Sequence, residues 1–140
     1  MLFRSRVPDR DTLGVLDYLV VNDIELAMIC DALGIESTDR AEPLARALGA
    51  KVLSTHGAAG AVLTDGEKAI RQPGRSVDVV DTTGAGDTFT GVFAACLVRG
   101  LSDAVALAQA NAAAAFSCKK PGAQTAQVGW EVFSEGVSAD

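Results

Sequence analysis

Residues 81–91 have the sequence DTTGAGDTFTG, and this stretch decides how the chain around it folds. A short β-branched run, Val77–Val80, precedes it, and an apolar run rich in small residues, Phe89–Leu97, follows. The pattern predicts a strand, a tight glycine turn and a helix in succession. The N-terminus of such a helix presents unpaired N–H groups, and small residues let an anion approach them closely. The sequence therefore predicts an anion site, for which phosphate is the natural ligand.

Asp87 lies in the first turn of this predicted helix. A carboxylate there would repel a bound phosphate unless it had another task, such as taking the proton from an attacking hydroxyl. Asp87 is therefore the candidate general base. The alternative is that Asp87 caps its helix, because Asp is favoured at that end, and that the glycines only permit a tight turn. The local pattern leaves both interpretations open.

The rest of the chain alternates predicted strands with predicted helices. Strands are expected at residues 16–21, 51–55, 61–64, 68–71 and 77–80, and helices at 23–33, 38–49, 102–117 and 130–135. The pair Asp65-Gly66 is a strong hairpin signal, so one antiparallel pair is expected. This order predicts a mostly parallel α/β sheet. Because ligands of such sheets bind at the carboxyl ends of the strands, Asn22, Thr55 and Asp81 are expected to meet at one edge.

Composition fits a single ordinary α/β domain, since 49% of the 140 residues are hydrophobic and 21% are charged. The net charge of -6, from 12 Lys and Arg against 18 Asp and Glu, disfavours a general surface for nucleic acid or for acidic membranes. No apolar run has membrane-spanning length, so a cytoplasmic protein is expected. Cys30, Cys96 and Cys118 are widely spaced in apolar settings typical of buried thiols. The lone His56 is expected to be a loop residue near the ligand rather than a metal ligand.

Four segments resemble the ribokinase-like (PfkB) family of carbohydrate kinases, in the family's own order. DTTGAGDTF at 81–89 is similar to the C-terminal signature, NDIE at 22–25 to the N-x-x-E motif, THGAAG at 55–60 to the T-x-G-x-x-G nucleotide loop, and GAQ at 122–124 to the segment after the last long helix. The resemblance runs from about Leu13 to about Trp130. It implies a ribokinase-like, Rossmann-like sheet flanked by helices, with one added β-hairpin and truncated at the N-terminus. Residues 1–140 would be the C-terminal ATP-binding and catalytic part of the kinase domain.

The resemblance implies that the protein is an enzyme, a kinase that transfers phosphate from ATP to a hydroxyl of a sugar or sugar-like small molecule, with a sugar or nucleoside as the acceptor. A ribose-like acceptor is favoured by the similarity of residues 120–124 to ribokinases. Asp87 would be the general base, and the backbone amides of Gly84, Ala85 and Gly86 would hold the charge that develops on the transferred group.

Further residues would serve ATP and Mg²⁺. Asn22 and Glu25 would hold Mg²⁺ through water or orient phosphate, although their spacing also fits a simple capping box. Thr55, Gly57 and Gly60 resemble the residues that let the nucleotide approach the backbone, whereas the alternative is a plain turn with glycines at positive φ.

Two more assignments follow from the resemblance. Asn111 would lie near the adenine ring, or else it is an ordinary Asn on a helix surface. Asp81 and Thr83 resemble a loop that binds K⁺ with the help of backbone carbonyls at residues 118–123, whereas the alternative is that Asp81 caps its own turn.

The resemblance covers only the C-terminal half of a typical family member. A second hypothesis is therefore a truncated fragment that binds nucleotide without an acceptor site. In this case the fold would be completed by a homo-oligomer or by a separate N-terminal half, and unpaired strand edges would promote association.

Overall fold

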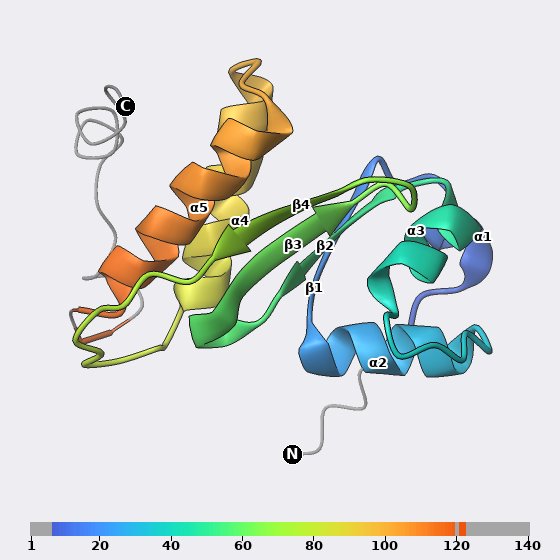
Figure 1. Ribbon diagram of the computed structural model, residues 1–140, viewed down its shortest axis with the longest axis horizontal. Coiled ribbons are helices and arrows are strands. Elements are labelled where there is room, and N and C mark those ends of the chain that lie inside the picture. Colours follow the sequence, from blue (N-terminus) through green and yellow to red (C-terminus); the bar gives the residue numbers. More distant parts are fainter. Residues whose placement is uncertain (1–6, 120, 123–140) are drawn as a thin grey trace. The chain divides into compact units, whose positions relative to one another are not determined.

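The computed structural model describes residues 7–119 and 121–122. One sheet holds the four described strands in the order β1-β2-β3-β4 (Figure 1). One compact unit comprises the described residues up to His56 together with Val62–Arg71, and a second comprises Gly57–Ala61 and the described residues from Gln72 onward. The elements in chain order are α1 (Arg10–Leu13), β1 (Tyr18–Asn22), α2 (Asp23–Ala32), α3 (Ala41–Leu48), β2 (Lys51–Thr55), the 3-10 turn η1 (Gly57–Ala59), β3 (Gly60–Thr64), β4 (Ala69–Pro73), α4 (Ala85–Val98) and α5 (Asp103–Ser117).

The sheet combines a parallel pair with a hairpin. β1 and β2 are parallel, and their register places Asn22 opposite Thr55 at the carboxyl ends of both strands. β3 and β4 are neighbours joined by a short turn, in which Asp65 Oδ1 accepts hydrogen bonds from the amides of Glu67 and Lys68 at 2.9 and 2.8 Å. The hairpin predicted from Asp65-Gly66 is therefore confirmed.

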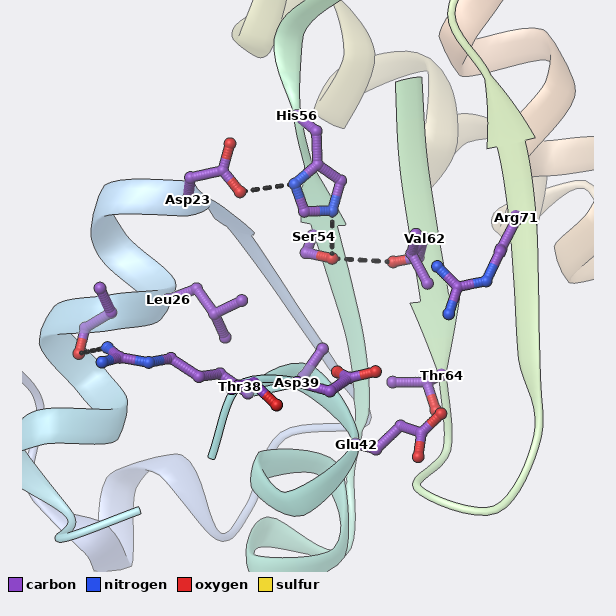
Figure 2. Close-up of a pocket in the computed structure, with 13 residues that line it drawn as sticks. Asp23, Leu26, Thr38, Asp39, Glu42, Ser54, His56, Val62, Thr64 and Arg71 are labelled. Carbon is purple, nitrogen blue, oxygen red and sulfur yellow. Dashed lines mark hydrogen bonds and ion pairs between the residues drawn. The ribbon is translucent and has the colours of Figure 1, made fainter. Parts of the chain in front are cut away.

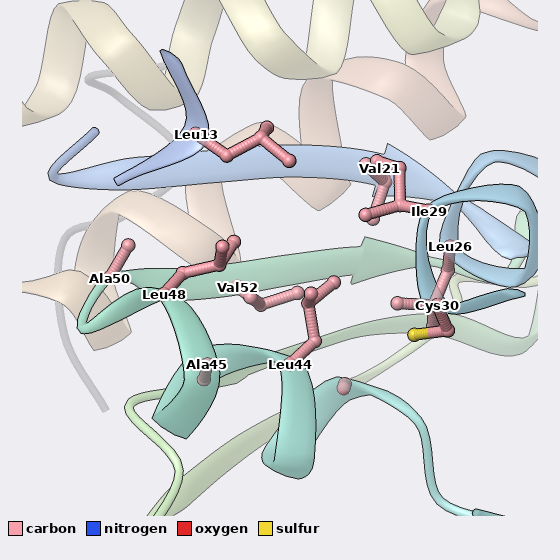
Figure 3. Close-up of a cluster of buried hydrophobic side chains, with 11 residues drawn as sticks. Leu13, Val21, Leu26, Ile29, Cys30, Leu44, Ala45, Leu48, Ala50 and Val52 are labelled. Atoms are coloured by element: carbon pink, nitrogen blue, oxygen red, sulfur yellow. The ribbon is translucent and has the colours of Figure 1, made fainter. Parts of the chain in front are cut away.

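The first unit has a hydrophobic core between its helices and the parallel strands (Figure 3). The buried residues of α3 recur at intervals of three and four, which is the spacing of one helix face. α2 buries a similar stripe, so its first turn is held at the end of β1. The core consists of Leu13, Val21, Leu26, Ile29, Cys30, Ala41, Leu44, Ala45, Leu48, Ala50 and Val52.

The second unit contains the helix pair α4 and α5, which pack side by side (Figure 1). Between them, the buried Cys96 Sγ donates to Gln109 Oε1 at 3.2 Å. Ser102 caps α5, because its Oγ accepts from the amide of Val105 at 3.4 Å. The long helix predicted to follow Ser102 is therefore confirmed, with its last residue at Ser117.

The strand predicted at Val77–Val80 is wrong, because these residues form no strand. Val79 and Val80 are 60% and 62% exposed. The amides of Val80 and Asp81 both donate to the carbonyl of Cys118, at 2.8 and 3.1 Å. A strand needs a neighbouring strand to pair its backbone groups, and here a single carbonyl beyond α5 takes two of them. Asp81 therefore does not follow a strand, and the expected meeting of three strand ends does not extend to it.

The start of α3 also differs from the prediction. The helix begins at Ala41, not at Thr38 or Asp39, and its N-cap residue Arg40 makes no side-chain capping bond. This start leaves Pro43 in the first helical turn, the one place where proline removes no helical hydrogen bond. The earlier start would have placed Pro43 beyond that turn.

The predictions for the smaller helices and the cysteines are confirmed only in part. α1 was not predicted, although Asp9 caps it by accepting from the amide of Thr12 at 2.8 Å. Cys30 and Cys96 are buried as expected, whereas Cys118, which caps the end of α5, is partly exposed. The helix predicted at 130–135 lies outside the described residues. In the described part of the chain, no helix is long and apolar enough to cross a membrane.

Candidate functional site

A capping box closes the start of α2. Asn22 Oδ1 accepts from the amide of Glu25 at 2.9 Å, and Glu25 Oε2 accepts from the amide of Asn22 at 3.0 Å. The alternative that Asn22 and Glu25 form a capping box is therefore confirmed. Both residues are exposed, and the side-chain Nδ2 of Asn22 and the Oε1 of Glu25 take no part in the box. The box thus fixes both side chains at one helix start and leaves polar atoms of each available for a ligand.

Thr55 lies beside this box, because its register partner across the two parallel strands is Asn22. Its Oγ1 donates to the carbonyl of Val21 on β1 at 3.4 Å. Three predicted site residues are therefore brought together at the carboxyl ends of β1 and β2.

The residues that directly follow these strand ends also meet, which was not predicted. His56 Nδ1 lies 2.5 Å from Asp23 Oδ1, and His56 Nε2 lies 3.0 Å from Ser54 Oγ (Figure 2). This meeting follows from the strand register. Because Asn22 pairs with Thr55 in the two parallel strands, the residues that come next, Asp23 and His56, lie at the same edge of the sheet. His56 is a loop residue, as predicted, and both of its ring nitrogens have partners.

A pocket of about 440 Å³ adjoins His56, with walls from α2, α3 and the strands of the first unit (Figure 2). Ser54 and Thr64 line its floor and are almost completely buried. Its rim carries charges of both signs, from Asp39, Glu42 and Arg71 among others. The mixed charges give this pocket no strong preference for an anion or a cation.

The glycine loop after β2 depends on the absence of side chains. Gly57 and Gly60 have φ values of 54° and 104°, a region that other residues rarely adopt. A Cβ on Gly60 would lie 2.0 Å from the carbonyl oxygen of Gln72. The loop is therefore pressed against residues 72–74, and backbone packing alone requires a glycine at position 60.

Asn111 contacts the same segment of chain. It is 7% exposed, and its Nδ2 donates to the carbonyl of Pro73 at 2.8 Å. The interpretation of Asn111 as an ordinary surface residue is therefore wrong. Asn111 and the glycine loop both contact the backbone of residues 72–74, so this segment lies against both of them.

The glycine turn of the 81–91 stretch leads directly into α4. Gly84 is the N-cap residue and has a left-handed φ of 77°. The amide of Ala85 donates to the carbonyl of Thr82 at 3.2 Å, so the turn itself uses one of the three predicted donors. The first amides of a helix have no helical acceptor, and a Cβ on Gly86 would meet nothing within 4 Å. The amide of Gly86 is therefore the best-placed donor for an anion.

Asp87 is the third residue of α4 and is exposed. The helix start has no side-chain capping bond, and the Asp87 carboxylate accepts no hydrogen bond from the described residues. The capping interpretation of Asp87 is therefore wrong. Its carboxylate lies one residue from the Gly86 amide in sequence and is available to a ligand.

Asp81 has a structural task in the turn that precedes this helix. Its Oδ1 accepts from the amide of Thr83 and its Oδ2 from the amide of Gly122, each at 2.9 Å. Hydrogen bonds from the Thr83 side chain and then the Gly122 amide lower the pKa of Asp81 from 3.8 to about 2. The interpretation that Asp81 caps its own turn is confirmed, and Thr83 is its partner in that turn.

The described residues contain no preformed metal cage. Within residues 7–119 and 121–122, no group of three or more His, Cys, Asp and Glu side chains could hold a metal ion. Magnesium usually keeps several waters and binds through one or two carboxylates plus substrate phosphate. The exposed Glu25 fits a site of that kind, which would be completed only by the nucleotide.

Comparison with known proteins identifies the class. The sequence profile of the pfkB family of carbohydrate kinases matches residues 4–128. A ribokinase of Bacillus subtilis is 36% identical over 120 residues, which are 86% of this chain. The chain belongs to the pfkB family of carbohydrate kinases.

Solved structures agree with this assignment. The crystal structure of a ribokinase from Thermotoga maritima matches 94% of this chain with a TM-score of 0.84 and 30% identity. That of Arabidopsis thaliana ribokinase, complexed with ribose and ATP, matches 94% with a TM-score of 0.80 and 32% identity. The α/β fold is therefore ribokinase-like. The chain spans 31–39% of the curated ribokinases of Lactococcus lactis, Bacillus subtilis and Arabidopsis thaliana, and 45% and 44% of these two structures.

Proposed function

We propose that this chain forms the ATP-binding and catalytic part of a carbohydrate kinase that phosphorylates a hydroxyl of a sugar, with a ribose-like acceptor favoured. The observation that carries the proposal is the exposed Asp87 carboxylate beside the open helix start at Gly86. A carboxylate that caps nothing, next to amides suited to phosphate, is the pairing that phosphoryl transfer to a hydroxyl requires. The ribose and ATP bound to the Arabidopsis ribokinase support this choice of substrates.

In the proposed mechanism, Asp87 accepts the proton of the acceptor hydroxyl as its oxygen attacks the γ-phosphorus of ATP. The bond from phosphorus to the bridging oxygen breaks, and ADP leaves. The amide of Gly86 stabilises the negative charge on the transferred group. The amides of Gly84 and Ala85 assist it, although that of Ala85 also donates to Thr82 in the turn. A donor of this kind contributes on the order of 100- to 1,000-fold to the rate, and a general base roughly 100- to 10,000-fold.

The remaining site residues fit the nucleotide and its ions. Glu25 would hold a hydrated Mg²⁺, which when bound neutralises phosphate charge, and the free Nδ2 of Asn22 would donate to a phosphate oxygen. Thr55, Gly57 and Gly60 would receive the nucleotide phosphates and ribose. A Cβ at Gly57 would meet nothing within 4 Å, which leaves room for close approach and supports this role, whereas Gly60 is packed against the backbone of residues 72–74.

Two further assignments belong to the same proposal. Asn111 would lie near the adenine ring, since it is anchored to the segment that supports the glycine loop. Asp81 and Thr83 would shape a K⁺ loop, in which backbone carbonyls are the ligands and the Asp81 carboxylate holds the turn.

The test is acceptor-dependent ADP release by the purified chain with Mg-ATP and K⁺, across a panel of sugars and nucleosides. Asp87→Asn should lower turnover by roughly 100-fold or more and leave ADP affinity within about twofold. Asp78→Asn, which changes another exposed carboxylate of the second unit, is the matched control and should change neither quantity. Turnover in Asp87→Asn equal to that of the control would remove Asp87 from the mechanism.

A second candidate function is nucleotide binding without turnover by this chain alone. It is favoured by the match to less than two fifths of the curated ribokinases. In that case ADP would bind, no acceptor would stimulate its release from ATP, and light scattering would report association with a second copy or another chain. A monodisperse monomer with acceptor-dependent turnover would exclude this candidate.

A further inference from the structure

The bonds of His56 form a continuous chain across the first unit. Asp23 is the first residue of α2, Ser54 lies within β2, and His56 directly follows that strand. A carboxylate can only accept, so the contact with Asp23 requires a proton on His56 Nδ1. His56 Nε2 lies 3.0 Å from Ser54 Oγ, and this almost fully buried hydroxyl donates to the carbonyl of Val62 at 3.4 Å. The imidazole is thus held in one orientation by partners on two elements.

The position of this chain of bonds links two parts of the proposed site. Asp23 lies between Asn22 and Glu25, the two members of the capping box. His56 lies between Thr55 and Gly57, the first two residues assigned to the nucleotide. Each end of the contact is therefore one or two residues from a group proposed to touch the metal or the phosphates.

The Asp23–His56 contact ties two segments that the sheet itself does not hold together. The backbone ladder pairs Asn22 with Thr55 and ends there. Beyond the ladder, the start of α2 and the exit of β2 could separate, because one turns into a helix and the other into a glycine loop. The contact between Asp23 and His56 joins these two segments at that point.

We propose that His56 is a positioning residue for the nucleotide: with Asp23 and Ser54, it fixes the exit of β2 to the start of α2, so that Thr55 and the Asn22–Glu25 box act on one metal-bound nucleotide. The inference deepens the proposed function and rests on it. Its particular consequence concerns magnesium. The relative placement of the two segments matters most when a metal bound at the box also binds the phosphate beside Thr55.

The experiment measures ADP affinity of the full 140-residue chain by titration calorimetry, once with Mg²⁺ and once with a chelator. The ratio of the two dissociation constants is the magnesium enhancement. Asp23→Asn and His56→Gln should each reduce this enhancement about threefold to tenfold, while metal-free ADP affinity stays within about twofold. The double variant should be no worse than the poorer single variant, because both changes weaken the same link.

Asp31→Asn is the matched control. Asp31 lies on the same helix, is 67% exposed where Asp23 is 65% exposed, and pairs with Arg40 at 3.0 Å. Its removal breaks an ion pair of similar exposure at the other end of α2 and should leave the magnesium enhancement unchanged. Thermal unfolding of wild type and every variant reports any general loss of structure. A general loss would lower affinity with and without Mg²⁺ alike, and that result would overturn the positioning role.

The outcomes separate the two proposals. A wild-type chain that binds no ADP under either condition would overturn both the proposed function and the role of His56. A wild-type chain that binds ADP more tightly with Mg²⁺, together with His56→Gln and Asp23→Asn variants that behave like Asp31→Asn, would overturn the role of His56 alone. A selective loss of the magnesium enhancement in these two variants would support it.

Discussion

The carboxylate of Asp81 accepts a hydrogen bond from the backbone amide of Gly122, which lies 41 positions later in the chain, at 2.9 Å. The other carboxylate oxygen of Asp81 accepts from the amide of Thr83. One side chain therefore joins the turn before α4 to the segment after α5. Hydrogen bonds from the Thr83 side chain, the Gly122 amide and the Thr83 amide favour the ionised carboxylate, which is why the pKa of Asp81 is lowered to about 2.

The first prediction is a pH-dependent contribution of Asp81 to stability. Its folded-state pKa of about 2 lies below the ordinary value of 3.8, so the contribution is complete above pH 3.8 and is lost as the pH falls through about 2. Urea unfolding at about pH 5 should therefore show wild type more stable than Asp81→Asn. The difference should shrink between about pH 4 and pH 2. Asp78→Asn should not reproduce this narrowing, and a gap of constant size down to about pH 2 would contradict the prediction.

The second prediction separates the two tasks of Asn22. Serine is also a good N-cap residue, so Asn22→Ser should keep the free energy of unfolding within about 0.5 kcal/mol, whereas Asn22→Ala should cost about 1 kcal/mol. Serine lacks the side-chain Nδ2 of Asn22, which the capping box leaves available to a ligand. Calorimetry should thus find weaker Mg-ADP binding in both variants. If Asn22→Ser binds Mg-ADP as wild type does, the residue is a cap and nothing more.

Features set by neighbours in sequence were predicted well. The helix after Ser102, the hairpin at Asp65-Gly66 and the alternative of a capping box at Asn22 each depend on residues within about four positions of one another. The hydrogen bonds that form these features are local, so residue type and spacing determine them.

Features set by distant partners could not be predicted in this way. Val77–Val80 has β-branched content, but the backbone acceptor it finds is the carbonyl of Cys118, far away in sequence. The contact between Asp23 and His56 depends on the register of two strands, which no local pattern contains. For the same reason the sequence could not exclude that Asn111 lies on a helix surface, because its partner, the carbonyl of Pro73, is on another element.

The third prediction concerns this buried amide. Asn111→Ala removes the donor to the Pro73 carbonyl and should cost about 1–3 kcal/mol in the free energy of unfolding measured in urea. Val105→Ala is the control, because Val105 is an exposed residue of the same helix and alanine is the better helix former. The control should stay within about 0.5 kcal/mol of wild type. An Asn111→Ala protein as stable as this control would mean that the bond to Pro73 contributes nothing.

The fourth prediction contrasts two glycines of the chain. At Gly60 an added Cβ would lie 2.0 Å from the backbone oxygen of Gln72, and the φ of 104° is itself unfavourable for alanine. Backbone cannot move aside as a flexible side chain can, so Gly60→Ala should cost about 3 kcal/mol or more and should also weaken ADP binding by displacing the loop. Gly91 lies within α4, where an added Cβ meets nothing within 4 Å. Gly91→Ala should therefore stabilise the fold by about 0.5–1 kcal/mol.

Urea unfolding and ADP titration of both glycine variants check this contrast. The two substitutions add the same methyl group, so a difference between them reports the surroundings of each Cα and not the chemistry of alanine. If Gly60→Ala were as stable as wild type, the loop could shift away from Gln72 without cost. The glycine at position 60 would then be explained by the approach of a nucleotide and not by the packing of the backbone, and ADP affinity would fall while stability did not.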